Sequence, residues 1–423
     1  EKLKEKMIAH QAKKESILRY MEGQNRQKSE GVVILYKIDF LKKIKVKNYI
    51  ILNATVINFI LDLSNELKKQ KKIYSYPELV YLMFWCSDKN LKNLIKDYKT
   101  DKLRLGRGLV FHICAANVST NFVFSFIFGI LSGNSNIIKI PTKETKEKKI
   151  ILSILKKILN FKKYSELKKN NHFIQYNNND KFTQEISKIC DVRIIWGSDN
   201  TISAIRKFEI QPRSIELTFA DRYSISVINL DNFLKLNKKK KLMLANKFFY
   251  DGYSMEQMAC NSPHFIFWVG KKNLDSINSF WDDLFYIVNK KIIFENIHIL
   301  KKNINLIKNI ISSEHIKNIR MYSNFLYTAE LHNTKNLNNI RGVNGTFFQV
   351  YLNNLSELEK FVSKKCQTAS YFGFKKEEIK NFVVKNHLKG IDRFVPIGSA
   401  LEMESDWDGF NFIDSLSRIV TLK

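Results

Sequence analysis

The stretch from Gly108 to Trp196 alternates short apolar runs with helix-like stretches, and this order restricts the fold more than any other feature of the chain. The apolar runs are rich in β-branched and aromatic residues and are expected as strands over Gly108–Ile113, Ile137–Ile140, His172–Tyr176 and Val192–Trp196. Helices are predicted between them over Phe122–Leu131, Glu144–Asn160 and Phe182–Ile189. Strands joined by such helices run in the same direction and are buried on both faces. The chain is therefore predicted to be an α/β protein with a parallel sheet.

The length of 423 residues is too great for one small core and indicates two or three domains. We expect a helical N-terminal part over residues 1–100, with helices at 1–22 and 53–71, and a sheet-bearing core over residues 101–229. The core also takes in a further strand pair, at 214–218 and 224–229. Residues 230–390 are expected to form a second α/β unit, with strands at 265–269 and 347–352 and helices at 233–249, 275–288 and 356–364. Residues 391–423 are expected to form a closing arm.

The formal charge of +29 raises the question of a polyanionic partner. The lysines are spread over the whole length, and a run such as Lys238–Lys241 is typical of the polar face of a helix. The chain contains no basic motif interleaved with aromatic residues, so we expect no nucleic-acid partner. A non-catalytic basic scaffold or nucleic-acid-binding protein stays open as an alternative.

The five cysteines are widely spaced and form no CxxC or Cys/His cluster. This spacing argues against a metal site or a disulfide framework and favours a reducing, cytoplasmic location. The longest apolar run, Asn121–Gly133, is too short to cross a bilayer, and the first residues lack the apolar core of a signal peptide. We therefore expect no transmembrane segment.

Residues able to carry chemistry lie in or just after the carboxyl ends of three of the expected strands, at the sheet edge where ligands of α/β proteins bind. Asn117 has an amide that suits a developing oxyanion, although it is also an ordinary turn residue. Lys139, with Lys143 nearby, suits a phosphate-bearing ligand, or is simply a charge at a strand end. Gly197 and Ser198 open a helix whose free N–H groups suit a pyrophosphate, or they only cap it. The sequence contains no GxGxxG fingerprint.

Cys260 lies between a short turn and the expected strand Phe265–Val269, with Pro263 marking the start of that strand. A thiol at such a point either faces a cleft as a nucleophile or packs inside as a small hydrophobe, and the surrounding nonapeptide alone favours packing. His264 is interpreted as structural, because strand alternation gives it no clear direction toward the thiol.

Three segments in order resemble the aldehyde dehydrogenase superfamily, and within it the fatty acyl-CoA reductases associated with bacterial luminescence. They are residues 107–141, residues 221–224 with 256–263, and residues 393–398 with 407–409 and 416–418. The resemblance implies a Rossmann-type cofactor domain that includes the N-terminal part, a catalytic domain over 230–390, and a C-terminal arm for closing or oligomerisation. It also implies a homo-oligomer.

The resemblance assigns a role to each candidate residue. Cys260 is similar to the nucleophilic cysteine, and Asn117 to the asparagine that stabilises the oxyanion. Lys139 is similar to the lysine that holds the adenosine ribose or its 2′-phosphate, and Gly197–Ser198 to the pair beside the pyrophosphate.

The resemblance also bears on the cofactor. Thr142 stands where many relatives that prefer NAD have a glutamate, and Lys143 follows it, which favours NADPH. If the loop after Lys139 is one or two residues longer than in those relatives, Glu144 takes the place of that glutamate.

One departure from the superfamily pattern narrows the expected reaction. Hydrolytic relatives carry a glutamate that activates water, and aligning Ser224 with the serine after that motif puts Phe219 in its place. Glu216 lies close by and would restore a carboxylate if the alignment slips. Without that base, the resemblance implies NADPH-dependent reduction of a long-chain acyl-CoA to the aldehyde through an acyl-enzyme. The alternatives are oxidation of an aldehyde to the acid, and reduction of acyl groups delivered by an acyl-transfer or synthetase subunit.

Overall fold

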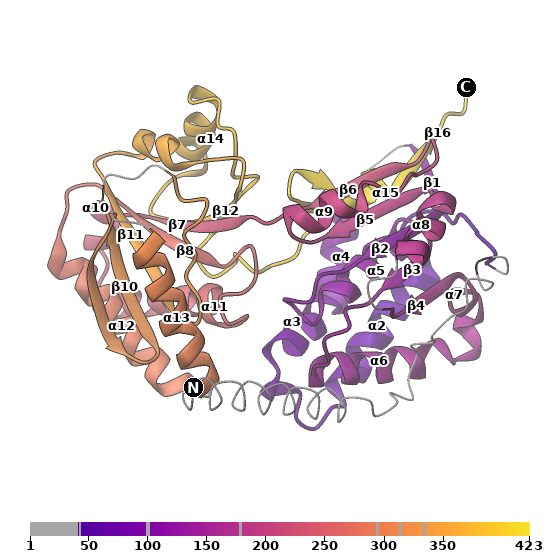
Figure 1. Cartoon of the computed structure of the whole chain (residues 1–423), viewed down its shortest axis with the longest axis horizontal. Coiled ribbons are helices and arrows are strands. Elements are labelled where there is room, and N and C mark those ends of the chain that lie inside the picture. Colours follow the sequence, from indigo (N-terminus) through magenta and orange to yellow (C-terminus); the bar gives the residue numbers. More distant parts are fainter. Residues whose placement is uncertain are drawn as a thin grey trace, which may run out of the picture.

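The computed structural model describes Leu41 and residues 44–98, 102–176, 180–292, 296–312, 315–332 and 336–423. The helix predicted at residues 1–22 lies outside these residues. Figure 1 shows two lobes, one built from the N-terminal half of the chain together with the last residues of the chain, and the other from residues between about positions 223 and 396. Each lobe has its own sheet.

The first lobe contains a five-stranded parallel sheet in the order β4-β3-β2-β5-β6. Its strands are β2 (Leu109–Ile113), β3 (Ser135–Lys139), β4 (Asn171–Ile174), β5 (Val192–Trp196) and β6 (Ile215–Phe219). The lobe's helices are α2 (Ala54–Lys68), α3 (Pro77–Trp85), α4 (Asp88–Asp97), α5 (Asn121–Leu131), α6 (Lys146–Leu159), α7 (Ser165–Asn170), α8 (Asp180–Ile189) and α9 (Asp199–Ile205), with short 3-10 turns at Ile73–Ser75 and Lys162–Tyr164. The predicted parallel sheet is confirmed.

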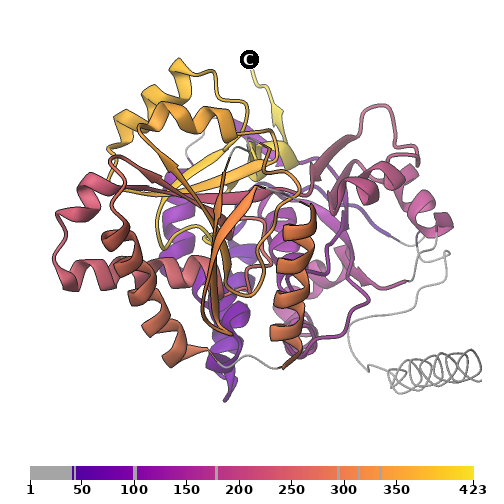
Figure 2. The ribbon, with the colours of Figure 1, turned by 60° about the vertical axis from the view of Figure 1, so that its left-hand side comes forward.

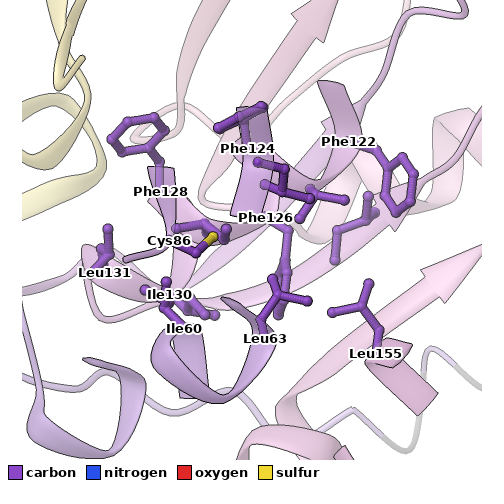
Figure 3. Close-up of a cluster of buried hydrophobic side chains, with 14 of the residues drawn as sticks. Ile60, Leu63, Cys86, Phe122, Phe124, Phe126, Phe128, Ile130, Leu131 and Leu155 are labelled. Atoms are coloured by element: carbon purple, nitrogen blue, oxygen red, sulfur yellow. The ribbon is translucent and has the colours of Figure 1, made fainter. Parts of the chain in front are cut away.

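Helix α5 forms the centre of the first lobe because it is apolar on every side, as expected of a helix enclosed by others. All its residues from Phe122 to Leu131 are buried. Figure 3 shows the phenylalanines of this helix in one buried cluster with Cys86, Leu63 of α2 and Leu155 of α6. Gly133 ends the helical stretch with φ +80°, the left-handed conformation that glycine adopts without steric cost.

The second lobe contains a seven-stranded sheet in the order β13-β12-β7-β8-β11-β10-β9, parallel except for the β9–β10 pair. Its strands are β7 (Tyr223–Asn229), β8 (Pro263–Val269), β9 (Ile316–Ser323), β10 (Leu326–Leu331), β11 (Thr346–Leu352), β12 (Cys366–Phe372) and β13 (Arg393–Pro396). The sequence pattern predicts the strand at 224–229 in the first unit, as a partner of the strand at 214–218. Instead β7 pairs with β8 and β12, so the change of sheet falls between Phe219 and Tyr223 rather than at position 229.

Helices cover both faces of the larger sheet, as Figure 2 shows from the side of this lobe. They are α10 (Leu230–Leu234), α11 (Lys238–Tyr253), α12 (Leu274–Lys291), α13 (Asn296–Ser312) and α14 (Lys376–Lys385). The helix predicted at 233–249 is split, because Asn237 caps a new helix through its side chain. The helix predicted at 356–364 is a 3-10 helix over Leu355–Phe361.

The C-terminal arm connects the two lobes. After β13 in the larger sheet, the chain forms a small hairpin, β14 (Asp406–Trp407) and β15 (Phe410–Asn411), followed by α15 (Phe412–Leu416). The ring of Phe412 stacks on Phe128 of α5 at 4.4 Å between centroids. The last strand, β16 (Ser417–Val420), then pairs with β1 (Leu103–Gly106). Among the described residues, no helix combines the length and the apolar character needed to cross a membrane.

Candidate active site

A cavity of about 490 Å³ lies where the two lobes and the arm meet. One wall is formed by the carboxyl ends of β2, β3, β5 and β6, and the other by the loop before β8 and the C-terminal arm. Five of the predicted site residues line it together: Asn117, Lys139, Gly197, Ser198 and Cys260. Thr142 and Lys143 are exposed and are not part of the lining. The cavity therefore unites most of the residues that the sequence placed at separate strand ends.

The loop that carries Cys260 is held in shape by the buried side chain of Gln257. Its Nε2 donates to the carbonyls of Pro263 (3.0 Å) and Thr346 (2.9 Å), and its Oε1 accepts from the N–H groups of Gly345 (3.1 Å) and Thr346 (3.2 Å). Gln257 has φ +61°, which costs energy for a residue with a side chain. These four hydrogen bonds offset that cost and fix the loop against the start of β11.

Cys260 itself is fixed through its carbonyl. Ser224 Oγ of β7 donates to this carbonyl at 2.7 Å and accepts from the N–H of Thr368 in β12 at 3.2 Å. The next residue, Asn261, donates from Nδ2 to the carbonyl of Ala400 in the arm at 2.6 Å. The thiol is half-buried and lines the cavity. The geometry is that of a side chain presented to a cleft, not of a thiol packed in a core.

The electrostatic surroundings of Cys260 favour the neutral thiol. Burial raises its pKa to about 11, with a further contribution from the charge of Asp408, while a backbone hydrogen bond from Arg222 and the charge of Arg341 lower it. A small thiolate fraction is therefore present near neutral pH, and reactivity rises with pH.

Asn117 connects the first lobe to the cysteine loop. Its Nδ2 donates to the carbonyl of Met258, two residues before Cys260, at 3.2 Å. Because an amide nitrogen carries two N–H groups, one remains available for another acceptor in the cavity. Asn117 thus contacts the loop that carries the thiol, and both residues line the cavity.

Lys139 is a half-buried cation in the cavity wall. Its Nζ lies 5.0 Å from the centre of the Tyr176 ring, and burial lowers its pKa, while the neighbouring Cys114 raises it. Within the described part of the chain, no carboxylate acts on the pKa of Lys139. A cation held in a cavity wall in this way suits a phosphate-bearing ligand.

Gly197 and Ser198 lie at the end of β5, where the chain turns into the seven-residue helix α9. Ser198 Oγ accepts from the N–H of Thr201 at 3.3 Å and so caps the helix. A Cβ atom at Gly197 would lie 3.0 Å from the side chain of Thr201, so this turn has little room for a larger residue. Glu144, the alternative to Thr142, forms an ion pair with Lys148 at 2.5 Å.

Phe219 and Glu216, the two candidates for the water-activating position, lie in different surroundings. Phe219 lines the cavity and stacks on Trp196 at 3.9 Å. The carboxylate of Glu216 is bound by Arg193 (Nη2, 2.5 Å) and Arg206 (Nε, 2.8 Å) and is not part of the lining. This arrangement leaves an aromatic ring, and not Glu216, facing the site.

A polar network in the cavity wall was not predicted. Asp408, in the turn between β14 and β15, accepts from Arg222 Nη1 at 3.2 Å and from Gln367 Nε2. Arg222 also contacts Asp392, and its Nη2 donates to the carbonyl of Cys366 at 2.7 Å. Asp408–Gly409 is a turn signal, and both residues have positive φ, but nothing in the local sequence pairs this turn with a strand forty residues earlier.

The other titratable candidates have clear positions. His264 is buried, its Nδ1 lies 3.0 Å from the carbonyl of Gly342, and burial lowers its pKa to about 3. It is therefore a neutral hydrogen-bonding residue, which agrees with the structural interpretation. Cys114 shares the cavity with Cys260, whereas Cys366 is buried outside its lining. Burial raises the pKa of both thiols.

The fold is similar to that of solved aldehyde dehydrogenases. GapN, a glyceraldehyde-3-phosphate dehydrogenase from Methanocaldococcus jannaschii, superposes with a TM-score of 0.60 at 12% identity, over 87% of this chain and 89% of that chain. Salicylaldehyde dehydrogenase from Pseudomonas putida gives 0.57 at 11% identity, over 86% and 84%. The bifunctional proline utilization A protein gives 0.59 at 9% identity over 84% of this chain, which spans only 40% of that longer protein.

The family to which the chain belongs follows from its sequence. Residues 44–280 match the family model of acyl-CoA reductase (LuxC), and since this match covers more than half of the chain, the chain belongs to that family. No curated protein matches it significantly. Family and fold together identify an oxidoreductase that acts on aldehyde or acyl groups.

Proposed function

We propose that the chain reduces a long-chain acyl-CoA thioester to the aldehyde, with NADPH as the reductant and Cys260 as the acyl carrier. The observation that carries this proposal is that one cavity joins Cys260 and Asn117 to Lys139. A nucleophile, an amide donor and a cation for a nucleotide phosphate are what this reaction needs in one place.

In the proposed reaction, the thiolate of Cys260 attacks the thioester carbonyl, and the CoA thiolate leaves with the electron pair of the broken C–S bond. The free N–H of Asn117 stabilises the oxyanion as it forms. The nicotinamide, when bound, supplies the hydride that reduces the acyl group. Cys260 then leaves as thiolate, the aldehyde is released, and one proton is taken up overall on the CoA sulfur.

Several features of the cavity support the details of the substrate and cofactor. Its lining is largely apolar and includes Tyr81, Phe124, Met255, Leu401, Met403 and Trp407, which suits an alkyl chain. Lys139 fits the phosphates or the 2′-phosphate of a dinucleotide, and the GapN structure that shares this fold was determined with NADP. Phe219 in the wall supports reduction of the acyl group by hydride over its hydrolysis by water, because a phenylalanine provides no general base at that position.

The test is to follow NADPH oxidation with a series of acyl-CoA chain lengths, with NADH in parallel, and to trap the aldehyde product. We expect aldehyde in equal amount to the NADPH oxidised, a higher rate with NADPH than with NADH, and no turnover in Cys260→Ala. Formation of free acid from aldehyde and NADP⁺ as the faster reaction would support the aldehyde-oxidising alternative. Turnover of an acylated partner protein without turnover of acyl-CoA would identify the partner protein as the acyl donor.

A further inference from the structure

Gln367 lies at the start of β12, in the cavity wall close to the nucleophile. Ser224 Oγ bridges the carbonyl of Cys260 and the N–H of Thr368. Gln367 directly precedes Thr368, so it lies next to this link to the cysteine loop. The residue lines the cavity, yet it is only 1% exposed. The proposed mechanism gives it no role.

The hydrogen-bond partners of Gln367 fix the orientation of its amide group. Nε2 donates to Oδ1 of Asp408, and Nη1 of Arg222 donates to the same oxygen at 3.2 Å. Burial raises the pKa of Asp408, whereas the charge of Arg222 lowers it and favours the carboxylate. A carboxylate can only accept, so the atom of Gln367 that faces it is the nitrogen. Oε1 therefore points elsewhere. It is buried and has no hydrogen-bond partner among the described residues.

An unpaired buried carbonyl oxygen is unfavourable, and its pairing with a ligand donor is correspondingly favourable. We propose that Oε1 of Gln367 accepts a hydrogen bond from an amide N–H of a bound ligand and thereby orients that ligand beside Cys260. The assignment rests on the proposed function. Two ligands of the reaction carry this donor: the carboxamide of the nicotinamide ring and the pantetheine arm of CoA.

Matched ligand pairs that differ only in the N–H group test the assignment, with binding measured by calorimetry in the Cys260→Ala background to prevent turnover. The first pair is NADP⁺ and its 3-acetylpyridine analogue, in which a methyl ketone replaces the carboxamide. The second is S-decanoyl-N-acetylcysteamine and S-decanoyl-2-acetoxyethanethiol, in which an ester oxygen replaces the N–H. Each ligand is titrated into the protein with Gln367 intact and into Gln367→Met, which removes both polar atoms at similar length.

For one of the two pairs, we expect Gln367→Met to weaken binding of the amide ligand about tenfold and of its amide-free analogue less than about twofold. The pair that shows this difference identifies the ligand. Gln367→Glu, which keeps an acceptor at this position, should retain the preference for the amide, and it replaces the Met variant as the test if that variant does not fold.

Equal losses for both members of each pair would overturn the assignment and reduce Gln367 to a support for Asp408. Failure of the protein with intact Gln367 to bind any dinucleotide or thioester would instead overturn the proposed function, and the assignment with it.

Discussion

Alkylation of Cys260 by iodoacetamide should be slow near neutral pH and should accelerate steeply as the pH rises. Burial and the charge of Asp408 raise the pKa of this thiol to about 11 from its ordinary value of 9.0. The difference is two units, and the thiolate fraction below the pKa changes tenfold per unit. At about pH 8 the thiol should therefore react roughly a hundredfold more slowly than an unperturbed cysteine.

Removing the charge of Asp408 should shift the pKa of Cys260 in a known direction. Since the Asp408 carboxylate raises the pKa of Cys260, Asp408→Asn should lower it and increase the alkylation rate at about pH 8. Arg341 lowers the same pKa, so Arg341→Met should slow alkylation. Asp406→Asn is the matched control, because this exposed carboxylate lies two residues before Asp408 in the same hairpin and does not line the cavity.

The assay is timed alkylation between about pH 7 and pH 11, with the Cys260 peptide quantified by mass spectrometry so that the other cysteines do not contribute. A wild-type midpoint near 9.0, or an Asp408→Asn midpoint equal to or above that of wild type, would refute the reasoning. Either result would mean that the cavity solvates the thiol far better than its burial indicates.

Three further substitutions test other parts of the site. Lys139→Met should raise the KM for NADPH about tenfold or more in initial-rate assays, whereas Thr142→Ala, exposed and outside the cavity lining, should change it less than about threefold. Asn117→Ala should lower kcat by roughly 10²–10³ with little change in acyl-CoA binding, and a loss confined to KM would contradict an oxyanion role. Gln257→Ala should reduce the free energy of unfolding by about 3 kcal/mol in denaturant titrations, because it leaves buried backbone groups unpaired; the adjacent exposed Glu256→Ala should cost much less.

Local sequence patterns predicted much of the fold because the first lobe is built from contiguous strand–helix units. Each of the four runs expected as strands between Gly108 and Trp196 overlaps a strand of the smaller sheet, and the carboxyl ends of these strands meet as parallel pairing requires. The same reasoning placed β7 in the wrong sheet. Its apolar pattern is the same whichever sheet it joins, and only pairing with β12, more than a hundred residues later, decides the matter.

The site also contains residues whose position the sequence could predict and residues whose position it could not. Asn117, Lys139 and Gly197 lie at or shortly after the carboxyl ends of strands, so their position at one edge of the sheet could be anticipated. The contacts among Arg222, Gln367 and Asp408 could not, since they depend on where the C-terminal arm returns between the lobes. The resemblance included the turn at 407–409 but gave it no role.

The most direct test of the account is acyl transfer to the enzyme from radioactive acyl-CoA in the absence of reductant. Labelled protein is digested and the labelled peptide identified, for wild type, Cys260→Ala and Cys114→Ala, the last serving as control because Cys114 shares the cavity. We predict label on the Cys260 peptide in wild type and Cys114→Ala, its loss in Cys260→Ala, and its release as aldehyde on addition of NADPH. Label that persists in Cys260→Ala would contradict the assignment of the nucleophile.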